Sequence, residues 1–251
     1  MLTGIASILV TVLAAIYTAF ILPSLQDYLK SRIARHNRQR EEIEAQRHKI
    51  NLTYLNPLRL SLEEAYIRLR EIAKDVDQQG IVPALLFIEN PADISTQEAE
   101  WFNGEGCYLI STCYITACLF FAIKQVRDHL PYLRLSRESD TELMNLLFRV
   151  SRAFLQDLGI FYVIQPSIGS DLYLSAQNRL MTYREFCERL QDPAHRVWCD
   201  RLILFFLETG QGKKRDRIPA ALHAIQELSA FLDKHIGKGV VIEERLKAEG
   251  I

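Results

Sequence analysis

The sequence predicts a mainly α-helical protein that a single helix near the amino terminus attaches to a membrane. Two observations lead to this fold class. Residues 1–26 carry no charged side chain and are mostly apolar. The rest of the chain has apolar residues at helical spacing, bounded by helix-capping residues, with little strand-like composition. We therefore expect a transmembrane helix, a helical stalk and a cytoplasmic helical bundle with at most a small β-hairpin.

The first segment, residues 1–25, is interpreted as the membrane anchor. Its apolar stretch from Leu2 to Leu22 has about twenty residues, which as a helix cover roughly 30 Å, the thickness of the hydrocarbon core of a bilayer. A cleaved secretory signal is the alternative. It fits less well, because no Lys or Arg precedes the apolar stretch and large side chains occupy its end, where cleavage needs small ones.

Basic residues that follow the apolar segment set the expected orientation. Such residues stay on the cytoplasmic side, so the amino terminus is expected outside and the body in the cytoplasm. The same side chains form a basic collar that either contacts anionic lipid headgroups or only sets the topology. The collar consists of Lys30, Arg32, Arg35, Arg38 and Arg40.

Residues 26–56 are predicted to form a solvated, charged helical stalk. They are rich in helix-forming residues, with basic residues first and Glu41, Glu42 and Glu44 next. Apolar positions are too sparse for the three or four heptads of a sustained coiled coil. A single stalk helix is therefore favoured, and a homodimer through the stalk is the alternative.

Residues 57–237 are predicted to form the helical body. Asn56-Pro57 is expected to break the stalk helix, and Ser61 with Glu64 has the spacing of a capping box for the next helix, which Gly80 ends. Later helices are expected to begin near Asp140, Thr182, Asp192 and Pro219.

The stretch from residue 106 to 123 is a second segment without charge. It contains several hydroxyl groups and is more polar than the first. A membrane span here would also place the basic residues after it on the wrong side. We interpret it as the central core helix of the body, which ends near His129 because Pro131 cannot continue a helix. A two-span protein is the alternative.

Three segments are expected to be irregular or extended. Residues 81–92 form either a short strand or a helical turn. Residues 160–174 have the strongest strand composition and predict a hairpin whose turn lies at residues 165–171. Residues 210–217 are expected to form a mobile basic loop, and residues 238–251 a charged tail.

Composition and motifs exclude several classes of function. Lys plus Arg number 30 against 31 Asp plus Glu, so the net charge of −1 gives no support for nucleic-acid binding. The five cysteines lack disulfide or zinc spacing and are typical of a reducing compartment. No phosphate-binding loop, dinucleotide fingerprint or nucleophile elbow is found in the sequence. We expect no metal, no cofactor and no catalytic residue.

Two polar clusters are the candidate ligand-binding residues. The first, Trp101 and Asn103, precedes the core helix, where a packed entry loop is the simpler interpretation. The second lies along the core helix and needs hydrogen-bond partners when buried, either within the protein or from a ligand. It comprises Tyr108, Ser111 and Thr112, with Gln177 and Arg179 expected to join from the segment after the hairpin.

These observations lead to two hypotheses of function. The first is a non-enzymatic, single-pass membrane protein whose cytoplasmic body docks another protein of unknown identity or serves as a scaffold. The second is a membrane-tethered enzyme or small-molecule sensor with a pocket along residues 106–130. The strong anchor, the solvated stalk and the lack of a reactive motif favour the first hypothesis.

Overall fold

The computed structural model describes residues 22–133 and 137–236. The predicted membrane helix, residues 2–22, therefore lies outside the described residues except for its last position, and the predicted tail, residues 238–251, lies outside them entirely. The chain divides into two units, Met1–Lys49 and Ile50–Ile251. Where the chain is described, it is mainly helical with one two-stranded sheet, which confirms the predicted helical bundle.

Helix α2, Leu22–Ile50, covers most of the predicted stalk. Its 29 residues correspond to about 43 Å of helix. Every side chain described between positions 28 and 49 is exposed, including the apolar Ile33 and Ile43. This part of α2 therefore buries no apolar face of its own.

A π-helical turn, Asn51–Leu55, follows α2, and helix α3, Asn56–Gln79, begins directly after it. The predicted break at Asn56-Pro57 is therefore wrong, and Ser61 lies inside α3 instead of capping it. Pro57 is tolerated because it lies in the first turn of α3, where its fixed φ suits a helix. Gly80 ends α3 as predicted, with a left-handed φ of 76°.

Two 3₁₀ turns and a short helix connect α3 to the core helix. The turns are Pro83–Leu85 and Pro91–Thr96, so the helical-turn alternative for residues 81–92 is the one found. Helix α4, Ala99–Asn103, follows them.

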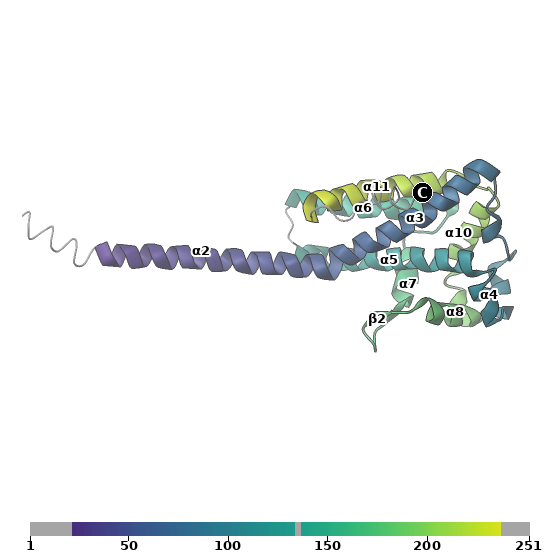
Figure 1. Ribbon diagram of the computed structural model, residues 1–251, viewed down its shortest axis with the longest axis horizontal. Coiled ribbons are helices and arrows are strands. Elements are labelled where there is room, and N and C mark those ends of the chain that lie inside the picture. Colours follow the sequence, from purple (N-terminus) through teal and green to yellow (C-terminus); the bar gives the residue numbers. More distant parts are fainter. Residues whose placement is uncertain (1–21, 134–136, 237–251) are drawn as a thin grey trace, which may run out of the picture. The chain divides into compact units, whose positions relative to one another are not determined.

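Helix α5, Cys107–Leu133, lies at the centre of the body (Figure 1). It contacts α3 along one side, and α6, α7, α8 and α10 along others. Among the described residues, Cys107–His129 is the one helical stretch long and apolar enough to cross a membrane, and 61% of its most apolar part is buried inside the protein. The packing is that of a core helix. The predicted end near His129 is wrong, since α5 continues past Pro131 to Leu133.

Helix α6, Arg137–Leu155, ends in a 3₁₀ turn, Gln156–Leu158. Helix α7, Gln165–Asp171, and a hairpin of β1, Tyr173–Leu174, with β2, Arg179–Leu180, come next.

The predicted position of the hairpin within residues 160–174 is therefore wrong in part. The expected turn, residues 165–171, is a helix, and the expected second strand is β1, which pairs with the later β2. One residue favours the helix, and a second allows its close packing on α5. Pro166 lies in the first turn of α7, where proline is favoured. Gly169 lets α7 approach α5 closely, since a Cβ atom at this position would lie 2.4 Å from the backbone nitrogen of Phe121.

The chain then forms α8, Tyr183–Gln191, and the short α9, Pro193–Arg196, followed by α10, Asp200–Gly210, and α11, Arg217–Ile236. The predicted capping box of Thr182 and Glu185 begins α8, and the Asp192 side chain caps α9. Trp198 is 61% exposed, because it lies in the turn between α9 and α10.

The predicted mobile basic loop, residues 210–217, is anchored at its last residue, Arg217, which is also the first residue of α11. Arg217 is fully buried and its Nη1 donates to Glu208 Oε2 at 2.6 Å. Its Nε and Nη2 donate to the carbonyl oxygens of Gln156 and Asp157 at 3.1 and 2.6 Å, and the guanidinium lies 5.0 Å from the centre of the Phe205 ring. Arg217 therefore joins α10, α11 and the end of α6.

Replacing Arg217 by Met is expected to lower the free energy of unfolding by about 3 kcal/mol, because two backbone carbonyls and the partly buried Glu208 lose their donor. Urea unfolding followed by circular dichroism measures this change. The control is Arg184→Met, which breaks the ion pair of an exposed arginine with Glu188 and should leave the unfolding curve unchanged. Equal curves for the two variants would show that Arg217 does not stabilise the fold.

Candidate functional site

Three of the predicted site residues converge on Arg68, a residue of α3. Its Nη1 atom lies 3.3 Å from Ser111 Oγ and 3.2 Å from Thr112 Oγ1. The same nitrogen lies 3.4 Å from the carbonyl oxygen of Tyr108, and the guanidinium lies 4.3 Å from the centre of the Tyr108 ring. The predicted polar cluster therefore has an internal cationic partner, which the sequence analysis missed because Arg68 lies on a helix about 40 residues earlier.

The hydroxyl groups of this cluster also bond to the backbone of α5 itself. Thr112 Oγ1 donates to the carbonyl oxygen of Tyr108 at 2.7 Å, and Ser111 Oγ lies 3.2 Å from the same oxygen. Thr116 Oγ1 donates to the carbonyl oxygen of Thr112 at 2.9 Å. These polar atoms are satisfied inside the protein.

A groove beside this cluster has a volume of about 520 Å³ and a highly charged lining. Tyr108 forms part of its wall. Burial raises the pKa of the Tyr108 hydroxyl to about 12, the positive charge of Arg68 opposes this shift, and Glu71 adds to it. The hydroxyl therefore stays neutral near pH 7. The remaining lining residues are Ile67, Arg70, Glu71, Lys74, Asp75 and Ala84.

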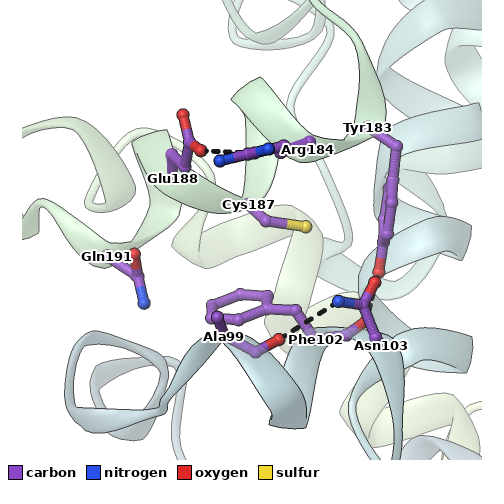
Figure 2. Close-up of a pocket in the computed structure, with 8 residues that line it drawn as sticks. All are labelled: Ala99, Phe102, Asn103, Tyr183, Arg184, Cys187, Glu188 and Gln191. Carbon is purple, nitrogen blue, oxygen red and sulfur yellow. Dashed lines mark hydrogen bonds and ion pairs between the residues drawn. The ribbon is translucent and has the colours of Figure 1, made fainter.

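A second pocket, of about 260 Å³, lies between α4 and α8 (Figure 2). Asn103 is at its edge, with its side-chain nitrogen 3.4 Å from the carbonyl oxygen of Ala99. Tyr183 closes one side by donating to the carbonyl oxygen of Phe102 at 2.8 Å. Along α8, Arg184 forms an ion pair with Glu188 at 2.8 Å. Cys187 and Gln191 complete the α8 side of the lining.

Trp101 does not line this pocket. Its ring packs against Gly106, where a Cβ atom would lie 2.3 Å from the indole, and meets the ring of Phe102 edge-on at 5.2 Å. Because only glycine leaves room for the indole, Trp101 is part of a packed entry to α5. Of the two predicted residues before α5, the pocket includes Asn103 only.

Gln177 and Arg179 lie away from the Arg68 cluster. Both are exposed on the hairpin, where Arg179 forms two hydrogen bonds with the Glu185 carboxylate at 2.7 and 2.6 Å. These bonds, together with those from Thr182, lower the pKa of Glu185 to about 2. Arg179 therefore fixes the hairpin to the start of α8.

The basic collar, Lys30, Arg32, Arg35, Arg38 and Arg40, is exposed on α2. This exposure keeps all five side chains available to solvent or to another charged surface.

Burial keeps four of the thiols protonated by raising their pKa, those of Cys113, Cys118, Cys187 and Cys199. Burial raises the pKa of Cys118 and Cys187 to about 11 and that of Cys199 to about 12. The described residues include no group of three or more His, Cys, Asp or Glu side chains that could hold a metal ion. His195 contacts the carboxylate of Asp192 at 2.6 Å.

No protein-family model, curated protein or solved structure matches this chain. The site must therefore be interpreted from its own chemistry.

The Cys187 thiol is expected to react slowly with a thiol reagent in the native protein. With a pKa of about 11, roughly one thiol in a thousand is ionised at pH 8, and its labelling rate should rise about tenfold per pH unit up to the pKa. Comparing the labelling of the native chain with that of Cys187→Ser isolates this residue. Rapid labelling at pH 7 that disappears in Cys187→Ser would instead indicate an activated thiol in the pocket.

Proposed function

We propose that this protein is a non-enzymatic docking protein held at a membrane. Residues 1–25 form a single transmembrane anchor with the amino terminus outside, and the helical body binds another protein in the cytoplasm. The uncharged residues 1–26, the basic collar and the exposed polar helix α2 support the attachment. One observation on the body carries the docking function, and it concerns the segment between α6 and α7.

This segment exposes four large apolar side chains within six residues. We call it the apolar segment and define it by Leu158, Phe161, Tyr162 and Val163, whose exposed fractions are 69%, 39%, 49% and 60%. Apolar surface costs about 25 cal/mol per Å² while it faces water, so a cluster of this kind is typical of an interaction site.

The backbone at the start of the apolar segment is held in a strained conformation. Asp157 and Leu158 have φ angles of 54° and 61°, in the left-handed region that non-glycine residues rarely adopt. Each such residue costs roughly 1–3 kcal/mol, and the surrounding structure must compensate for it. Arg217 and Lys214 both donate to the carbonyl oxygen of Asp157. The protein therefore presents the apolar segment on a fixed turn, which lowers the entropy lost on binding.

The alternative, an enzyme or a small-molecule sensor, is supported by the charged groove at Tyr108. Docking is the better proposal, because the hydroxyls of Ser111 and Thr112 already have partners and the Cys187 thiol is protonated. These groups are not poised to act on a ligand.

The proposed topology predicts that both the stalk and the body are protected from outside the membrane. We expect Asn37→Cys and Ser175→Cys, both at exposed positions, to resist a membrane-impermeant thiol reagent in intact cells and to react after permeabilisation. A Cys107→Ser background removes the one native thiol that is not buried. Labelling of both sites without permeabilisation would indicate the opposite orientation. Labelling of Ser175→Cys alone would indicate that α5 is a second membrane span.

The docking function predicts that a partner protein contacts the apolar segment. A photo-crosslinking phenylalanine derivative at Tyr162 should give a discrete protein adduct in cells, whereas the same group at the exposed Ser175 should not. Changing Leu158 and Val163 to Ser should remove the adduct without changing the melting temperature, since both side chains are exposed. Equal adducts from the two positions, or none from Tyr162, would contradict the proposal.

A further inference from the structure

A second surface of the body is a groove between α6 and α11. The two helices lie side by side (Figure 1) and the groove between them has a volume of about 600 Å³. Its floor contains Ala153 of α6 with Ala220 and Ala224 of α11. Because alanine side chains are short, another helix can approach the two backbones closely here.

The rim of the groove has more positive than negative charge. Arg149 of α6 is exposed and forms two hydrogen bonds of 3.0 Å with Glu227 of α11. His223 lies 3.7 Å from the same carboxylate. Arg152, also exposed, has no ion pair or hydrogen bond with any residue that the structure describes. The lining of the groove thus contains two arginines against a single carboxylate.

An apolar ridge on α6 continues from the basic rim. Phe148 is 51% exposed and lies one helical turn before Arg152, and Met144 is 38% exposed and lies one turn before Phe148. The polar end of the groove, at Gln156, is next to the apolar segment, since Gln156 and Leu158 belong to the same 3₁₀ turn. The groove and the apolar segment are therefore neighbouring surfaces.

We propose that this groove binds an acidic amphipathic helix of the partner protein. The inference rests on the proposed docking function and adds the chemistry of the partner. The carboxylates of the partner helix pair with Arg149 and Arg152, and its apolar side chains cover Phe148 and the alanine floor. Two parallel ridges with short side chains between them suit a helix, and the excess of arginine selects negative charge.

The other candidate occupant is this chain's own carboxyl-terminal segment. Residues 238–251 include three apolar residues, Val240 to Ile242, followed by Glu243 and Glu244. A test must therefore separate a partner from this segment. We favour a partner because the adjoining apolar segment also requires one.

The experiment measures binding of a designed peptide to the full chain in uncharged lipid nanodiscs by fluorescence anisotropy. The probe is a fluorescein-labelled helical peptide of about 18 residues, long enough to form a helix, with Leu on one face and Glu on the other. A second peptide has Gln in place of every Glu. We expect the Glu peptide to bind roughly tenfold more tightly, with an affinity that falls as salt rises.

Two variants locate the binding surface. Arg152→Gln should weaken binding of the Glu peptide roughly threefold or more, whereas Arg201→Gln, the same change at an exposed position of α10, should not. Phe148→Ala should weaken both peptides, because it removes apolar contact.

Four outcomes would overturn the inference. Equal binding of the Glu and Gln peptides, or equal loss in Arg152→Gln and Arg201→Gln, would show that the groove does not select acidic partners. Absence of binding to both peptides would show that the groove does not bind an amphipathic helix. Crosslinked adducts from Tyr162 would in that case still support the docking function. Binding that appears only after deletion of residues 238–251 would assign the groove to the chain's own terminus.

Discussion

Burial of the middle of α5 on all sides is the constraint on which the rest of the body depends. Five consecutive residues, Thr116 to Phe120, are each at most 8% exposed. Consecutive residues point in directions about 100° apart around a helix, so this pattern is possible only when neighbours cover every face. Helices α3, α6, α7, α8 and α10 supply that cover. The close contact with α7 further requires a glycine, Gly169, where any side chain would meet the α5 backbone.

A helix surrounded in this way must also satisfy its polar groups within the protein. Some of these bonds stay within α5, and others tie α5 to another element. Arg68 of α3 bonds to the hydroxyls of Ser111 and Thr112. Tyr114 donates to the carbonyl oxygen of Met181, just after the hairpin, at 2.6 Å. Tyr183 of α8 donates to the carbonyl oxygen of Phe102 in α4, the helix that precedes α5. Polar residues that resemble a ligand site in the sequence thus serve largely to orient neighbouring elements.

The two surfaces proposed to bind a partner share one buried residue. Arg217 holds the carbonyl oxygens of Gln156 and Asp157, the first of which belongs to a residue lining the groove and the second to the turn before the apolar segment. A cation without access to water is costly unless it is paired, and Glu208 provides the charge that keeps it there. The core and the binding surfaces are therefore stabilised together. A partner that contacts both surfaces would meet a rigid unit instead of two independent loops.

The sequence by itself determined the mainly helical class, the stop of α3 at Gly80 and the capped start of α8, because these follow from periodicity and from bonds within a few residues. It could not determine that residues 165–171 form a helix or that Arg217 is buried, because both depend on neighbours far along the chain. The candidate site was likewise predictable only in part. The polar cluster of Tyr108, Ser111 and Thr112 could be recognised from its residues, but its partner Arg68 lies on another helix. The tertiary structure alone decided which polar groups face each other and which apolar side chains remain exposed, since packing between distant segments controls both.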